Sequence, residues 1–178
     1  MSFAQDQAAI VFCEALGLSF LISAWTKAHD MEAFRLIAMG YPGVSRLGVR
    51  ASASLIVLAE TVIGTALIGA MWRTDIGATA AILWIVTASG AIALRRMRGE
   101  KRFQCGCGSD LSEETSAALL LVRNTLLLAG LAAVLAFTSD QPISSSELTA
   151  DLLAAVAVLL SIHLLRAATR TWRRVREW

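Results

Sequence analysis

The sequence is poor in aromatic residues, in cysteine and in net charge. Aromatic residues make up only 7% of the 178 residues. The apolar residues are mainly Ala, Leu, Ile and Val, as in helix bundles embedded in lipid. The net charge of +2 is too small to indicate a nucleic-acid-binding protein. The three cysteines cannot all pair within the chain.

Hydrophobic residues, by contrast, are in excess. They make up 56% of the chain, and the mean hydropathy is +0.62. Soluble domains are usually about 45–50% apolar. The length allows one domain and leaves little room for a soluble one. The composition therefore predicts an all-α integral membrane protein, a polytopic helix bundle formed by residues 1–178 as a single domain.

Five apolar segments approach the ~20 residues that a helix needs to cross a bilayer. Their approximate bounds are 8–26, 49–72, 76–94, 117–138 and 148–165. Asp75 and Gly77 separate the second from the third, and Pro142 with the serines after it separates the fourth from the fifth. The first segment lacks a basic region before it and contains Glu14, so we expect a retained span and not a cleaved signal peptide.

Basic residues gather in three regions that five spans would place on one side of the membrane. These regions lie between the first and second segments, between the third and fourth, and after the fifth. They hold every Lys and Arg except Arg73 and Arg123, namely Lys27, Arg35, Arg46, Arg50, Arg95, Arg96, Arg98, Lys101, Arg102, Arg166, Arg170, Arg173, Arg174 and Arg176. Because cytoplasmic loops are enriched in Lys and Arg, the pattern predicts an inner-membrane protein with its N-terminus outside and its C-terminus cytoplasmic.

Glu14, Glu60 and Arg123 are charged residues within the apolar segments. A charge facing lipid is costly, so we expect such side chains to face the bundle interior and find partners. The sequence favours a Glu60–Arg123 ion pair between helices. Such a pair is either purely structural, or Arg123 also supplies positive charge to a nearby site. Asn124, beside Arg123, can hydrogen-bond across helices.

The motif Phe103-Gln104-Cys105-Gly106-Cys107-Gly108 lies between two apolar segments and beside basic residues. Residues i and i+2 of a helix point about 200° apart, so the two thiols cannot pair within one. The glycines permit other backbone angles. A disulfide over so short a spacing is expected to be strained, and strained disulfides tend to be labile or catalytic. Lys101, Arg102 and Arg123 would favour the reactive thiolate. Cys105 and Cys107 are thus the predicted catalytic residues of a redox-active pair.

The residues that follow this motif predict the start of a helix. Ser112-Glu113-Glu114-Thr115 combines a capping residue, either Ser112 or Asp110, with acidic residues in the first turn.

Other interpretations of the cysteines remain open. The pair can be a structural thiol pair or disulfide, or half of a zinc site, although no Cys or His lies nearby in the sequence to complete one, and we expect no metal. His29 and His163 are the only histidines, and we expect both to be polar residues at interfaces. Cys13 lies about 21 Å deeper than Lys27 along its helix and is predicted to be a core residue.

The sequence resembles methylamine utilisation protein MauE and its relatives in the MauE/DoxX family of redox-associated membrane proteins. The resemblance covers most of the chain up to about residue 138. Its most specific part combines the cysteine motif with an Arg-Asn pair. The residues that carry it are Ala15-Leu16-Gly17-Leu18-Ser19-Phe20-Leu21, Ala24, Lys27, Glu60, Gly99, Cys105-Gly106-Cys107-Gly108 and Arg123-Asn124. The family commonly has Phe-Gly after the second cysteine, where this chain has Gly108-Ser109.

The resemblance implies a helper role in making methylamine dehydrogenase. The small subunit of that enzyme is periplasmic, rich in disulfides and carries tryptophan tryptophylquinone. Family members are thought to act with a thioredoxin-like protein of the MauD type in forming those disulfides or in exporting the subunit. Lys27, Glu60, Arg123 and Asn124 are the supporting residues that the resemblance carries over. By analogy with other small membrane thiol oxidants, a quinone is the expected electron acceptor.

The predicted topology conflicts with this role. The charge pattern places Cys105 and Cys107 on the cytoplasmic side, whereas an oxidant of periplasmic proteins needs them outside. Either the segment dips into the bundle, or electrons cross the membrane, or the charge rule fails.

Two other functional classes stay open. A chaperone or assembly subunit would depend on the bundle surface and not on the thiols. A small-molecule transporter would need a polar path through the bundle, for which three charged residues within the spans are few.

Overall fold

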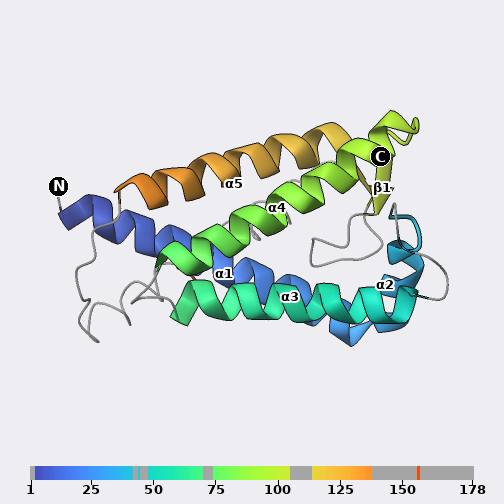
Figure 1. Cartoon of the computed structure of the whole chain (residues 1–178), viewed down its shortest axis with the longest axis horizontal. Helices are drawn as coiled ribbons and strands as arrows, with labels where there is room; N and C mark the ends of the chain where they lie inside the picture. Colours follow the sequence, from blue (N-terminus) through green and yellow to red (C-terminus); the bar gives the residue numbers. More distant parts are fainter. Residues whose placement is uncertain are drawn as a thin grey trace, which may run out of the picture.

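The computed structural model describes residues 3–41, 44, 48–69, 74–104, 114–137 and 156. Five helices and one short hairpin make up this part of the chain (Figure 1). The elements are α1 (Phe3–His29), α2 (Met31–Ala38), α3 (Val49–Gly69), α4 (Thr74–Met97), β1 (Arg102–Gln104), β2 (Glu114–Ser116) and α5 (Ala117–Phe137).

Four of the helices are long and apolar enough to cross a membrane, and they confirm the predicted polytopic all-α bundle. The candidate spans are Ala8–His29, Val49–Gly69, Ile76–Met97 and Ala117–Ala136. They coincide with the first four predicted segments. The predicted fifth span, 148–165, falls outside the described residues except for Val156, which is helical.

Two of the spans extend further than the sequence indicated. α1 continues beyond residue 26 to His29, and α4 continues beyond residue 94 to Met97. The last turn of α4 includes Arg95, and basic residues are favoured at a helix C-terminus because the macrodipole is negative there. Hydropathy alone does not detect these polar last turns.

α2 is a short helix that was not predicted from the sequence. The Asp30 carboxylate caps its N-terminus by accepting a hydrogen bond from Ala33 N at 3.1 Å. Phe34, Ile37 and Ala38 are buried and form an apolar cluster with Ala53 of α3. α2 therefore lies against the end of the bundle at which α1 ends and α3 begins (Figure 1).

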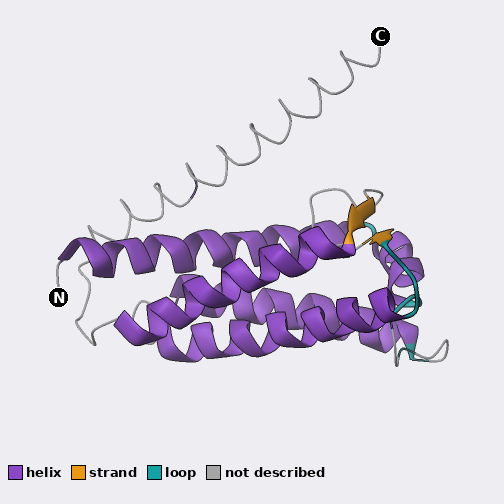
Figure 2. Cartoon of the chain, turned by 90° about the horizontal axis from the view of Figure 1, so that it is seen from above, coloured by secondary structure: helices purple, strands orange, loops and turns teal. Residues whose placement is uncertain are grey.

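The connection between α4 and α5 contains an antiparallel two-stranded hairpin. Arg102 pairs with Ser116 and Gln104 with Glu114, and Ala117 N donates to Lys101 O at 3.0 Å. The predicted helix start at 112–115 is therefore wrong in the part that the structure describes, because backbone pairing holds residues 114–116 in a strand. Figure 2 shows the strands (orange) at the end of the bundle near α2.

α1 and α3 pack closely through facing glycines. A Cβ built on Gly17 would lie 2.8 Å from Gly64 O, and a Cβ on Gly64 would lie 2.8 Å from Gly17 O. Small residues at such a crossing let two helix backbones approach, which is the usual way for helices to pack in a membrane.

The four long helices form two pairs. The two pairs share an apolar core near one end of the bundle but not near the other end. α1 packs along α3, and α4 packs along α5 (Figure 1). Near one end a single apolar cluster joins all four helices, with Cys13, Leu16, Ile63, Leu67, Ala78, Ala81, Ile85, Leu131 and Val134. Toward the other end the described apolar clusters are separate. One belongs to α2 and α3, and the other contains Ile92, Ala117 and Leu120 of α4 and α5.

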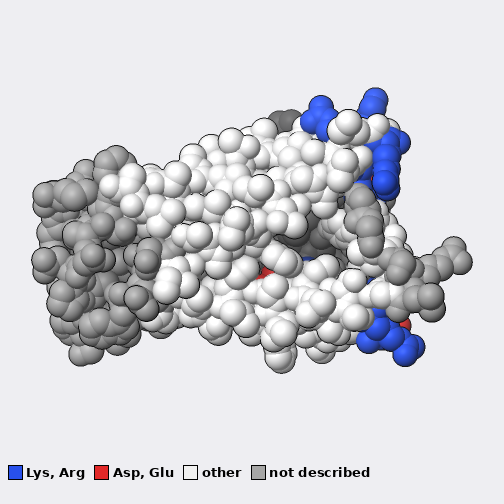
Figure 3. Space-filling view, in the orientation of Figure 1, with Lys and Arg blue, Asp and Glu red and all other residues white. Residues whose placement is uncertain are grey.

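The end at which the pairs separate is also the basic end of the molecule. The described Lys and Arg residues outside the bundle interior gather there, as Figure 3 shows in blue. This basic end contains the end of α1, α2, the start of α3, the end of α4, the β1–β2 hairpin and the start of α5. Lys27 does not belong to this surface, because it is only 1% exposed. Counting it as a loop charge was therefore wrong.

Candidate functional site

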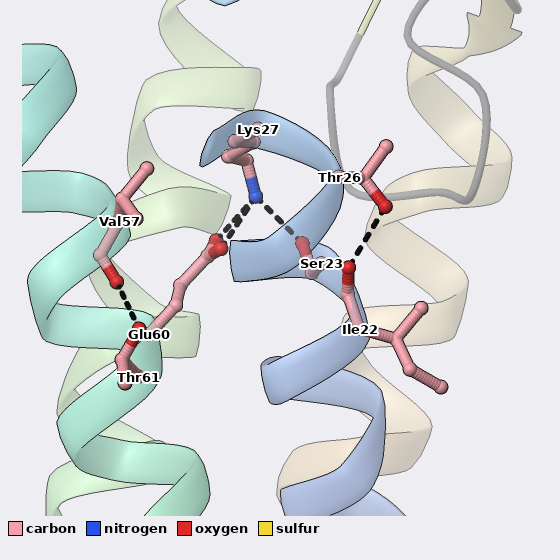
Figure 4. Close-up of polar contacts among 7 residues, drawn as sticks. All are labelled: Ile22, Ser23, Thr26, Lys27, Val57, Glu60 and Thr61. Carbon is pink, nitrogen blue, oxygen red and sulfur yellow. Dashed lines mark hydrogen bonds and ion pairs between the residues drawn. The ribbon is translucent and has the colours of Figure 1, made fainter. Parts of the chain in front are cut away.

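Lys27 of α1 makes a buried ion pair with Glu60 of α3 (Figure 4). Its Nζ donates to Glu60 Oε1 at 2.7 Å, to Glu60 Oε2 at 2.5 Å and to Ser23 Oγ at 2.6 Å. An ammonium group has three N–H donors, so these three acceptors use all of them. Helical side chains point back toward the N-terminus, which lets Lys27 reach Ser23 four residues earlier and turn its charge into the bundle.

Phe34 covers the ion pair from α2. The Lys27 ammonium lies 5.4 Å from the centroid of the Phe34 ring, which is within cation–π distance. The Lys27 and Glu60 side chains are only 2% and 6% exposed. Burial of this kind strengthens the attraction between the two charges, but it also raises the cost of losing either partner.

Glu60 faces the bundle interior as predicted, but its predicted partner was wrong. Its ion-pair partner is Lys27, whereas Arg123 donates from Nε and Nη2 to Asn124 Oδ1 at 3.3 and 3.0 Å. In the sequence, Lys27 directly follows the first apolar segment and was counted among the basic residues that precede the second segment. α1 instead continues through Lys27, and the length of the lysine side chain closes the gap.

Asn124 links α5 to α4. Its side chain is 3% exposed, and Nδ2 donates to Ser89 Oγ at 3.0 Å. This is the hydrogen bond across helices that the sequence predicted for Asn124. Its partner Ser89 was not predicted, because one serine in an apolar segment carries no distinguishing signal.

Arg123 lies on the face of α5 that is turned toward α1. Gly130 of α5 packs against the Phe12 ring of α1, since a Cβ on Gly130 would lie 2.5 Å from Phe12 Cζ. Arg123 precedes Gly130 by seven residues, which is close to two helical turns and therefore the same face. Arg123 is half-buried and lies nearer the basic end, where the helix pairs separate.

These residues give the basic end a polar interior. Lys27, Glu60 and Ser23 belong to the α1–α3 pair, and Arg123 and Asn124 belong to the α4–α5 pair. Glu60 lies about 16 Å along α3 from Val49, and Asn124 about 10 Å along α5 from Ala117. Figure 3 shows a hollow between the two helix pairs, with acidic atoms (red) at its floor.

Arg95 connects the two helix pairs at the basic end. It is 9% exposed, and its Nε and Nη2 donate to Glu100 Oε2 at 2.9 and 2.5 Å. Its guanidinium also lies 5.4 Å from the Tyr41 ring centroid and close to Gly40, just after α2. Arg95 is thus engaged at the entrance of the polar interior.

The predicted catalytic residues Cys105 and Cys107 lie outside the described residues, within segment 105–113. The chain on both sides of this segment is described. Gln104 precedes it, Glu114 follows it, and these two residues are paired in the β1–β2 ladder. Both ends of the cysteine segment are therefore fixed beside each other at the basic end.

Cys13 and Glu14 of α1 are buried away from the Lys27–Glu60 ion pair. Cys13 is 1% exposed within the apolar cluster that joins the four helices, which confirms the predicted core cysteine. Glu14 is also 1% exposed, and its helix position places it about 20 Å from Lys27.

His29 is exposed and stacks on Trp25 with the ring centroids 6.3 Å apart. His163 lies outside the described residues. Within the described ranges, no group of three His, Cys, Asp or Glu residues is placed to hold a metal ion.

Comparison with known proteins identifies the family. The model of the family "Methylamine utilisation protein MauE" matches residues 5–138. This chain belongs to the MauE family. A similar protein, "Methylamine utilization protein MauE" of Paracoccus denitrificans, is 27% identical over 146 residues, which cover 82% of this chain and 78% of the relative. No solved structure matches the chain.

The MauE match includes all four described spans and both cysteines of segment 105–113. Membership of the family implies involvement in methylamine utilisation, and the four apolar helices agree with a multi-pass membrane protein.

Proposed function

We propose that this MauE family member is a membrane thiol–disulfide exchange factor, with Cys105 and Cys107 as its reacting pair. The observation that carries the proposal is the pairing of Gln104 with Glu114, which holds both ends of the cysteine segment at the mouth of a polar interior. Arg102 is exposed at the start of β1, two residues before Gln104, and Arg123 is half-buried in α5. Positive charge on both sides supports a thiolate, which is the attacking species in disulfide exchange.

The proposed client is the small subunit of a periplasmic methylamine dehydrogenase, reached through a thioredoxin-like partner of the MauD type. The Cys105–Cys107 disulfide takes two electrons and two protons from the partner's dithiol. The partner leaves as a disulfide, and Cys105 and Cys107 become thiols. The partner then oxidises two client thiols in the same way. Each exchange breaks one S–S bond and forms one S–S bond.

A membrane quinone is the proposed final oxidant, because it would accept the two electrons and two protons released when the Cys105–Cys107 pair is reoxidised. The described surface offers an open groove of about 430 Å³ between α1 and α3, lined by Leu21, Ile22, Ala24, Trp25, Ala28, Val57 and Thr61. This lining fits an apolar prenyl chain. Its one hydroxyl, on Thr61, already donates to Val57 O at 2.8 Å, so the groove supplies no dedicated donor for a quinone ring.

We further propose that the basic end faces the cytoplasm, with the N-terminus outside and the protein in the inner membrane. The described basic residues at one end support this orientation through the positive-inside rule. The polar interior reaches about 16 Å inward from that end, which supports a route for the cysteine chemistry into the bundle.

Substitution of the cysteines tests the function. Cys105→Ser and Cys107→Ser, each made singly, should abolish client maturation while the protein still inserts and accumulates. A mixed disulfide trapped between one single variant and the thioredoxin-like partner would support the exchange step. Normal maturation with both variants would instead favour an assembly or chaperone role that depends on the bundle surface.

A further inference from the structure

The open groove between α1 and α3 faces away from the polar interior of the bundle. Trp25 lines the groove and is 73% exposed, whereas Lys27, two residues later, is 1% exposed. Residues two apart on a helix point about 200° apart, so the groove and the buried ion pair lie on opposite sides of α1. Both helices that form the groove are candidate membrane spans. The groove therefore opens toward lipid.

The lining of this groove favours an apolar chain. Apart from Thr61, the lining residues are Leu, Ile, Val, Ala and Trp. The Thr61 hydroxyl already donates to Val57 O at 2.8 Å, which leaves the Trp25 indole at the exposed rim as the side-chain donor of the lining. A quinone tail fits such a lining, but a quinone ring has two carbonyl acceptors to satisfy. An amphiphile whose polar group lies beyond the end of the groove fits better.

Polar side chains lie beyond the groove on the same face of α3. Arg50, Ser54, Val57 and Thr61 follow one another at spacings of four, three and four residues, which places them on one face of the helix. Val57 and Thr61 line the groove, and Arg50 and Ser54 continue that face toward the basic end, where both are exposed. Among the described residues, no hydrogen bond or ion pair engages the Arg50 guanidinium.

The depths of the groove and of Arg50 match those of a lipid tail and a lipid headgroup. α3 has 21 residues, so it is about 31 Å long and spans the ~30 Å hydrocarbon layer with Arg50 at the boundary. Helical side chains point back toward the N-terminus, which directs this guanidinium outward to the headgroups. Val57 lies about 10 Å deeper, among the acyl chains. Trp25, which stacks on His29 near the end of α1, is of a residue type enriched at membrane interfaces.

We propose that this groove binds one anionic phospholipid, with an acyl chain along Val57 and Thr61 and the phosphate on Arg50. A guanidinium presents a planar fork of N–H donors, which matches two phosphate oxygens. Apolar contact in the groove and charge complementarity at its end act on the two parts of the same molecule. The binding is non-covalent. It goes beyond the proposed cysteine chemistry and does not depend on it.

Native mass spectrometry of the full-length protein in detergent tests the headgroup contact. The delipidated protein is mixed with equal amounts of phosphatidylglycerol and phosphatidylcholine that carry the same acyl chains. Phosphatidylglycerol should be retained about fivefold more than phosphatidylcholine, because one basic residue near the membrane surface attracts an anionic lipid by about that factor. Arg50→Gln should abolish this preference. Arg96→Gln, an equally exposed change on α4, which does not line the groove, should preserve it.

A second variant tests the groove itself. Ala28 is an exposed residue of the lining, and Ala28→Phe fills the groove with an aromatic ring. Most of the retained phosphatidylglycerol should be lost. Ala133→Phe makes the same change at an exposed position of α5 and should leave retention unchanged. If Ala28→Phe does not fold, the response of the lipid preference to Arg50→Gln decides.

Two results would overturn the proposal. Equal retention of the two phospholipids, or a preference that survives Arg50→Gln, would mean that the groove holds bulk lipid or a segment of this chain outside the described residues. Ubiquinone is added in a parallel sample. If ubiquinone is retained, Ala28→Phe removes it and the protein shows no preference between the phospholipids, the groove belongs to the quinone. Client maturation enters none of these measurements, so the proposed function stands or falls separately.

Discussion

Gly17 of α1 and Gly64 of α3 face each other so closely that each Cα lies against the backbone carbonyl of the other. A Cβ on either residue would come within 2.8 Å of that oxygen. A backbone carbonyl oxygen cannot relieve such a contact by changing rotamer, as a flexible side chain can. This contact therefore sets the distance between α1 and α3, and with it the geometry in which Lys27 reaches Glu60.

Gly64→Ala should destabilise the protein by at least about 2 kcal/mol, because one methyl group would force the two helices apart. Gly90→Ala is the matched control, since Gly90 lies in α4 with no atom within 4 Å of its added Cβ. That substitution should be neutral or slightly stabilising. Thermal unfolding in detergent compares the two variants. Equal losses of stability would contradict the close crossing.

The Lys27–Glu60 pair should show strong coupling in a double-mutant cycle. Lys27→Met and Glu60→Leu should each cost about 3 kcal/mol or more, because each strands one buried charge. The double variant should recover much of that loss. The exposed Arg35–Glu32 pair should couple by less than about 0.5 kcal/mol. Additive losses at Lys27 and Glu60 would show that the two charges do not stabilise each other.

Accessibility labelling should place the basic end in the cytoplasm. Gly69→Cys and Arg98→Cys lie at opposite ends of the bundle, and both positions are exposed. In a chain without its native cysteines, a membrane-impermeant thiol reagent should label Gly69→Cys in intact cells. Arg98→Cys should react only after the membrane is permeabilised. The reverse pattern would show that the positive-inside rule fails for this protein.

Cys13 should remain unreactive in the folded protein. It is 1% exposed in the apolar cluster that joins the four described spanning helices. Maleimide should label Cys13 only after denaturation, and Cys13→Ala should leave client maturation unchanged. Rapid labelling in the native state would mean that this cluster opens more readily than its packing indicates.

The sequence predicted those features that depend on composition over many residues. Four spans follow from hydropathy, and burial of Glu60 follows from the cost of a charge in lipid. The partner of Glu60 was missed because it depends on one helix continuing three residues beyond the apolar segment. The spacing of Ser23 and Lys27, four residues apart, was a usable signal. It places both polar groups on one face of α1.

The hairpin was missed for a different reason. Its strands are three residues each, too short for an alternating pattern to appear. Glu114 and Thr115 also suit the first turn of a helix, so local preference favoured the wrong element. Pairing with residues 102–104 decided the outcome, and such pairing between separate segments is not visible in local sequence.

The order of Lys27 and Glu60 along the chain has a consequence for biosynthesis. α1 leaves the ribosome before α3, so the ammonium group reaches the membrane ahead of the carboxylate. Before α3 is inserted, a lysine near the end of a span can extend its ammonium group to the lipid headgroups. A carboxylate about 16 Å inside the span is too deep to reach the headgroups. When α3 enters the bilayer, its acid therefore meets a counter-charge that is already in place, and α1 serves as the insertion partner of α3.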